Sequence, residues 1–85
     1  MIDEGLFKKL IEQLLAIRTK AEMENFLRGI LTPKEIEEIP TRLQIVKMLK
    51  RGMPQHQIAK ELEIGVATVT RGSKEIQKGR FRVVK

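Results

Sequence analysis

The sequence predicts an all-α fold of short helices, two of which pack closely as a pair. Three observations support this prediction. Apolar residues recur at helical spacing along most of the chain, helix start and stop residues separate these stretches, and the segment 54–77 has the pattern of two short helices joined by a tight turn. The 85 residues suffice for one small domain, without a repeat or an interdomain linker.

The first 30 residues predict two helices, one near 4–18 and one near 20–30. The apolar stripe of the first is wide for such a short element, which suggests contact with more than one neighbour, such as a second subunit. This stripe comprises Leu6, Phe7, Leu10, Ile11, Leu14, Leu15 and Ile17. In the second helix we expect burial of Met23, Phe26, Leu27 and Ile30.

A strong helix start follows at residues 32–35. Thr32 can cap, Pro33 fits the first turn because it needs no hydrogen bond there, and Glu35 completes a capping box. We expect this helix to be brief and to end near Ile39.

Pro40 is then expected to begin a new helix that runs to about Arg51, with Gly52 as its stop. Its inward side chains are predicted to be Leu43, Ile45, Val46 and Leu49.

The segment 54–77 follows as two helices, the first starting at Pro54. The residues expected on their buried sides are Ile58, Ala59 and Leu62 in the first, and Val66, Val69 and Ile76 in the second. Glu63 occupies a turn position where φ is often positive, so we expect strain there unless the turn has rearranged. Gly79 should end the last helix, and the basic tail after it is too short to form a sheet alone.

Charge is unevenly placed along the chain. Residues 1–41 hold six basic and eight acidic side chains, a balance of −2, whereas residues 42–85 hold eleven basic and three acidic, a balance of +8. The positive half contains the helix pair. Such a split favours a polyanionic partner, and a solvated basic face is the alternative.

The helix pair has the features of a DNA-binding helix-turn-helix, in which one helix positions the other in the major groove. Small Ala59 lets the two helices cross closely, while Thr68, Thr70, Arg71 and Lys74 are expected to face outward. Hydroxyls, methyls and basic groups suit base edges and phosphates, although threonines can also simply be tolerated on a surface. The candidate DNA-binding residues are Gln55, His56, Gly65, Val66, Ala67, Thr68, Thr70 and Lys74.

Four stretches together resemble the Trp repressor family: LTPKE at 31–35, TRLQIV at 41–46, LKRG at 49–52 and GVATVTRGS at 65–73. The resemblance implies an all-helical, intertwined homodimer that binds a palindromic operator as a transcriptional repressor. It implies a single domain over 1–85, with dimerisation helices in 1–52, the helix-turn-helix in 53–77 and a basic tail in 78–85.

The resemblance also implies a pocket for L-tryptophan as a co-repressor. Its expected residues are Gly29, Leu31, Thr32, Arg42, Arg71, Gly72 and Glu75. An arginine can pair with a carboxylate and cover an indole face. Where the family offers a serine near the ligand's ammonium, this chain has Glu75, which can hold the ammonium or pair with Arg71. For Arg42 the alternative is a pair with Glu38.

Other classes of function have little support in the sequence. There is no Gly-rich phosphate loop and no Ser/His/Asp set, so we expect no enzyme, and one histidine without cysteines makes a poor metal site. No long apolar run or secretory signal is visible, which predicts a cytoplasmic protein without a membrane partner. Two alternatives to a repressor are the DNA-recognition subunit of a mobile-element transposase and an architectural protein that coats DNA through charge.

Overall fold

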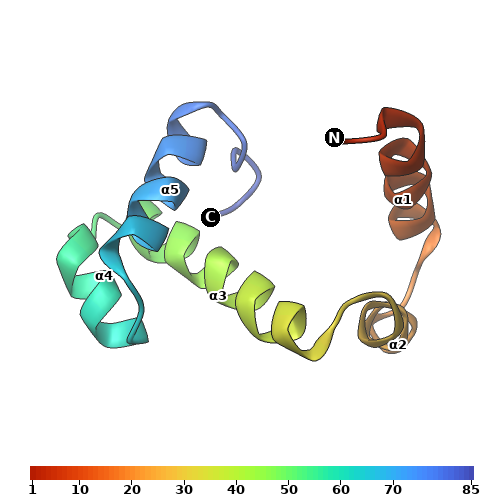
Figure 1. Cartoon of the computed structure of the whole chain (residues 1–85), viewed down its shortest axis with the longest axis horizontal. Helices are drawn as coiled ribbons and strands as arrows, with labels where there is room; N and C mark the ends of the chain where they lie inside the picture. Colours follow the sequence, from red (N-terminus) through yellow and green to blue (C-terminus); the bar gives the residue numbers. More distant parts are fainter. The chain divides into compact units, whose positions relative to one another are not determined.

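The computed structural model describes residues 1–85 and contains five α-helices and no strand, which confirms the predicted all-α class. The helices are α1 (Glu4–Ala16), α2 (Lys20–Ile30), α3 (Pro33–Lys50), α4 (Gln55–Leu62) and α5 (Val66–Gln77) (Figure 1). The chain divides into two compact units, residues 1–36 and residues 37–85. No helix is both long and apolar enough to span a membrane.

In the first unit, polar side chains start each helix. The Asp3 carboxylate accepts a hydrogen bond from the Leu6 N–H at 3.1 Å, and the Thr19 hydroxyl accepts one from the Glu22 N–H at 3.1 Å. Such caps satisfy backbone donors that a helix leaves free at its N-terminus. The sequence therefore predicted the starts of α1 and α2 to within a residue.

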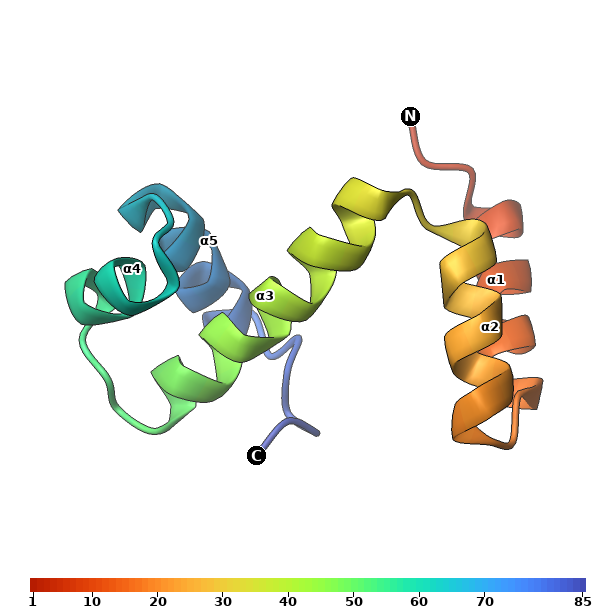
Figure 2. The same cartoon turned by 90° about the horizontal axis from the view of Figure 1, so that it is seen from below.

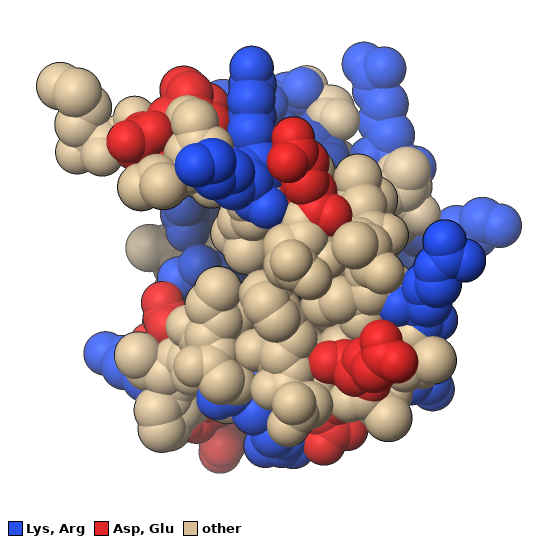
Figure 3. All heavy atoms as spheres, turned by 90° about the vertical axis from the view of Figure 1, so that its right-hand side faces the viewer, with Lys and Arg blue, Asp and Glu red and all other residues tan.

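No side chain of α1 or α2 is fully buried within the chain. Phe7, Ile11 and Leu15 are exposed and lie four residues apart, so they form one row along α1. Figure 3 faces α1 and α2 and shows a broad area of uncharged atoms with charged groups around it. The expected burial is only partial for Met23, Phe26 and Leu27. It is wrong for Ile30, which is 53% exposed.

Helix α3 is continuous, so the predicted break between Ile39 and Pro40 is wrong. Proline inside a helix removes one hydrogen bond and crowds the carbonyl four residues earlier, at a cost of about 3 kcal/mol. Two features offset this cost. The capping box holds the start of α3, and burial of Ile45 and its neighbours holds the end.

The core lies in the second unit, where α3, α4 and α5 meet (Figure 2). Its buried residues are Ile45, Val46, Met48, Ile58 and Val69. The sequence predicted all of these except Met48. The predicted burial of two others is wrong: Leu43 is 44% exposed and Val66 is 52% exposed. Leu43 stands two residues from Ile45, about 200° around the helix, and therefore lies on the opposite face.

The turn between α4 and α5 contains the strain expected at Glu63. This residue has φ 54° and ψ 48°, in the left-handed region, and its N–H donates to the carbonyls at the end of α4. A left-handed conformation costs a residue with a β-carbon about 1–2 kcal/mol. The chain therefore keeps this turn although the side chain of Glu63 disfavours the left-handed conformation.

Replacing Glu63 with glycine should raise the free energy of unfolding by about 0.5–1 kcal/mol, because glycine adopts this conformation freely but has more entropy to lose on folding. Glu61→Gly, inside α4, is the matched control and should lower it by about 1 kcal/mol. Urea denaturation of both variants measures the difference. A loss of stability in Glu63→Gly would show that the turn is not strained.

The C-terminal tail is held against α5 and the end of α3. Gly79 has φ +80°, its N–H donates to the Ile76 carbonyl at 2.9 Å, and the Arg80 N–H donates to the Glu75 carbonyl at 3.2 Å. This is the Schellman pattern that ends many helices. The Lys50 ammonium then donates to the carbonyls of Phe81 and Val84.

Candidate nucleic-acid interface

Helix α5 is fixed on one side by the core and open on the other. Val69 is fully buried, and Ala59 of α4 is half-buried against the same cluster. A β-carbon at Gly72 would lie 3.2 Å from Ile45 Cγ2, so glycine at this position lets α5 approach α3 closely. The core contacts of α5 thus decide which of its side chains face solvent.

The exposed residues of α5 include most of the predicted reading face. These are Val66, Ala67, Thr68, Arg71 and Lys74. Neither the Arg71 guanidinium nor the Lys74 ammonium forms a hydrogen bond or ion pair within the chain. Gly65, the N-cap of α5, has open space around its α-carbon. This face therefore presents methyl groups, one hydroxyl and two cations that have no partner within the chain.

Thr70 was expected to face outward, but its side chain is not free. It is half-buried, and its hydroxyl lies 2.7 Å from Gln55 Oε1 and 3.1 Å from the Val66 carbonyl. Gln55, the first residue of α4, is also half-buried. His56 beside it is exposed.

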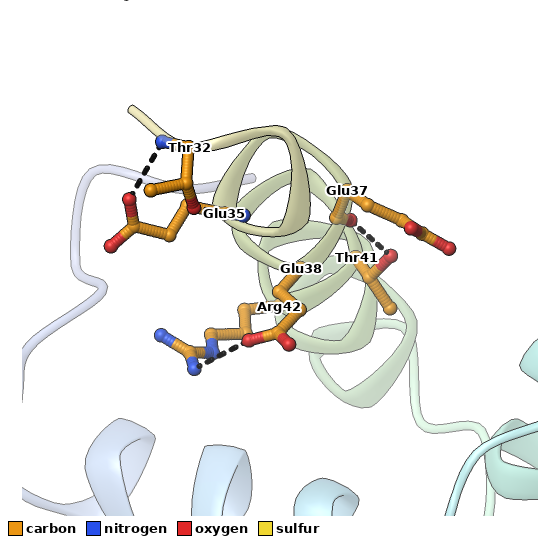
Figure 4. A network of polar contacts seen from close by, with 6 residues as sticks. All are labelled: Thr32, Glu35, Glu37, Glu38, Thr41 and Arg42. Atoms are coloured by element: carbon orange, nitrogen blue, oxygen red, sulfur yellow. Dashed lines mark hydrogen bonds and ion pairs between the residues drawn. The ribbon is translucent and has the colours of Figure 1, made fainter. Parts of the chain in front are cut away.

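The candidate ligand residues of the first unit have local structural roles. Thr32 and Glu35 form the predicted capping box: the Thr32 N–H donates to Glu35 Oε1 at 2.8 Å, and the Glu35 N–H donates to the Thr32 hydroxyl at 3.2 Å (Figure 4). Leu31 is the half-buried C-cap of α2, and its N–H donates to the Leu27 carbonyl at 2.9 Å. Gly29 is exposed on α2.

In the second unit, Arg42 forms the pair with Glu38 that was the alternative to a ligand role. Arg42 Nη2 lies 3.6 Å from Glu38 Oε2, and both side chains are well exposed (Figure 4). An exposed pair of this kind is worth only about 0.3–0.5 kcal/mol. It therefore leaves the guanidinium free to exchange its partner for another carboxylate.

Glu75 pairs with two cations at the end of α5 and in the tail, Lys78 and Arg80, rather than with Arg71. Its carboxylate lies 3.4 Å from Lys78 Nζ and 3.4 Å from Arg80 Nε, so the pair with Arg71, one of the two alternatives for Glu75, does not form. Desolvation raises the pKa of Glu75, but the hydrogen bonds and charges of Lys78 and Arg80 outweigh it and hold the pKa below its usual value. The Schellman turn explains why Glu75 pairs with Arg80 rather than with Arg71, because the turn folds Arg80 back over Glu75.

No role was expected for Lys50, Lys78 or Arg80. Lys50 reaches carbonyls 31 and 34 residues away, a contact without a sequence signal. The contacts of Lys78 and Arg80 could have been predicted from the sequence, because Gly79 marks a helix end at which the chain reverses.

The pairing of Glu75 predicts a stability difference that depends on pH. A carboxylate whose pKa is lowered by folding contributes stability above its usual pKa of about 4.3, and that contribution is lost as the pH falls through the lowered value. Wild type should therefore exceed Glu75→Gln in free energy of unfolding near neutral pH, and the gap should close in acid. Denaturation series from pH 7 to pH 3 measure this gap, and a gap that widens in acid would contradict the assignment.

The arrangement of α4, its turn and α5 defines a helix-turn-helix protein of the kind that regulates transcription. The sequence model described as "Trp repressor protein" matches residues 6–83. The chain therefore belongs to the Trp repressor family, which consists of transcriptional repressors rather than enzymes.

Several relatives carry the name "Trp operon repressor homolog". That of Vibrio campbellii is 32% identical over 72 residues, which cover 84% of this chain and 72% of the relative. That of Actinobacillus succinogenes is 39% identical over 64 residues, covering 74% and 63%. That of Vibrio vulnificus is 43% identical over 52 residues, covering 60% and 51%. No solved structure gave a significant match.

Proposed function

We propose that this protein is a homodimeric repressor that binds a palindromic DNA operator in the cytoplasm and inserts α5 into the major groove. The observation that carries the proposal is the outer face of α5. Thr68 and its small apolar neighbours are exposed beside Arg71 and Lys74, whose charges have no partner in the chain. The second half of the chain, with its balance of +8, supplies attraction to a polyanion.

A homodimer is supported by the first unit, where no side chain of α1 or α2 is buried and large apolar residues are exposed. A chain this small has little core to hold such a unit by itself. A second copy that covers the apolar row of α1 would complete the core and pair two α5 helices for a two-fold symmetric site.

Selection of bound DNA from a random pool tests the DNA proposal. Against the selected site, Thr68→Ala should reduce discrimination between bases by ~1–3 kcal/mol, because it removes a methyl and a hydroxyl from the reading face. Lys74→Ala should weaken binding to all sequences alike and flatten the salt dependence, because it removes a phosphate contact. Tight, salt-dependent binding without any preferred site would instead favour an architectural DNA-coating protein.

We propose L-tryptophan as the co-repressor, held by Arg42, Thr32 and backbone carbonyls of one subunit and by Arg71, Gly72 and Glu75 of the other. Arg71 is uncommitted and can meet the ligand's carboxylate or indole face. The Glu75 carboxylate can bind the ligand's ammonium in addition to its two cationic neighbours, Lys78 and Arg80.

Calorimetric titration tests the ligand. Tryptophan should bind wild type more tightly than indole propionate, which lacks the ammonium, and Glu75→Ser should narrow this difference. The bound ligand should tighten DNA binding by the same factor by which DNA tightens the ligand. Absence of heat with either compound on either protein would leave a repressor without this co-repressor.

A further inference from the structure

A side-chain hydrogen bond joins the two helices of the motif. The Thr70 hydroxyl, in the middle of α5, lies 2.7 Å from Oε1 of Gln55, the first residue of α4, fifteen positions earlier. Both residues are half-buried. The bond therefore links the helix proposed to read bases with the helix that positions it.

The hydroxyl proton of Thr70 decides how the Gln55 amide is oriented. A hydroxyl has one proton, and two acceptors lie within reach: Gln55 Oε1 at 2.7 Å and the Val66 carbonyl at 3.1 Å. The hydroxyl donates to Gln55 Oε1, which is the nearer of the two acceptors. Oε1 is then the inward end of the amide and Nε2 the outward end.

The outward end is a free donor. Gln55 Nε2 has no hydrogen-bond partner in the chain, and no buried side-chain nitrogen or oxygen is left without one, so Nε2 must reach solvent. A phosphate oxygen can only accept hydrogen bonds, so it requires a donor of this kind. If the amide were reversed, Oε1 would face solvent and repel a phosphate.

We propose that Thr70 is a positioning residue for Gln55. Its hydroxyl does not contact DNA but holds the amide so that Nε2 donates to a backbone phosphate at the side of the groove where α4 crosses. This inference rests on the proposed DNA binding through α5. It assigns the phosphate contact to Gln55 of α4, and it assigns the orientation of the Gln55 amide to Thr70 of α5.

Three variants separate the positioning role from a direct contact. Thr70→Val keeps the shape but removes the hydroxyl, and should weaken binding to every DNA sequence about 3–10-fold, the value of one hydrogen bond. Thr70→Ser keeps the hydroxyl and should bind like wild type. Gln55→Glu keeps the acceptor for Thr70 but places a carboxylate at the phosphate, and should bind more weakly than Thr70→Val.

A double-mutant cycle completes the test. Thr70→Val in a Gln55→Ala background should cost nothing further, and neither change should alter the salt slope, because neither removes a charge. Thermal melts check folding, and the Gln55 side-chain amide signals in NMR should shift in Thr70→Val without DNA.

Additive losses in the cycle, or a Thr70→Val protein that loses base preference rather than overall affinity, would overturn the positioning role while DNA binding stands. Wild type that binds no DNA at low salt would instead overturn the proposed function, and this inference with it.

Discussion

Replacing Ile58 with alanine should lower the free energy of unfolding by about 2–5 kcal/mol, the range for removing a large aliphatic side chain from a core. Ile58 is 0% exposed and packs in one cluster with Ile45, Met48 and Val69. Because this cluster is nearly the whole core, the cavity has few neighbours that can collapse into it. Small domains are stable by only about 5–15 kcal/mol, so such a loss removes much of the stability.

Urea denaturation at fixed protein concentration measures this loss. Val66→Ala is the matched control, since it also shortens a branched side chain of the motif but at a residue that is 52% exposed. It should change stability by less than about 0.5 kcal/mol. Equal losses in the two variants would contradict the view that the helix-turn-helix is held by these few buried residues.

The parts of the fold that the sequence predicted depend on local rules. The capping box of Thr32 and Glu35 is encoded within four residues, and the buried positions Ile45, Ile58 and Val69 follow from helical periodicity. The left-handed Glu63 was predictable because its place in the turn demands that conformation.

The errors arise where contacts outside the pattern of a single helix override the rule that the pattern suggests. Pro40 predicted a break, but the capping box and the buried end of α3 keep the helix continuous. The outward direction assigned to Thr70 ignored Gln55, fifteen residues earlier, which becomes its neighbour only when α4 and α5 cross. Helical spacing suggested Arg71 as an ion-pair partner of Glu75. The chain reverses after α5, however, and places Arg80 beside the Glu75 carboxylate instead.

The two units differ in what they bury, and this difference leads to the second large effect. The second unit contains the buried core, whereas the first leaves Phe7, Ile11 and Leu15 exposed as a row. If a second copy covers this row, Ile11→Lys would place an unpaired charge in an apolar interface, at a cost of several kcal/mol. The dimer should dissociate at concentrations where wild type is intact.

The same substitution should abolish tight operator binding although it touches no DNA-facing residue. Two half-sites bound by linked heads gain about 10²–10⁴-fold over one head, and a monomer loses this gain. Gln13→Lys adds the same charge to α1 but at an exposed polar position, about 200° around the helix from Ile11, and should leave both dimer and affinity intact. Sedimentation equilibrium and operator titration of the two variants measure both effects. A dimeric Ile11→Lys protein with wild-type affinity would show that this row of α1 lies outside the interface between subunits.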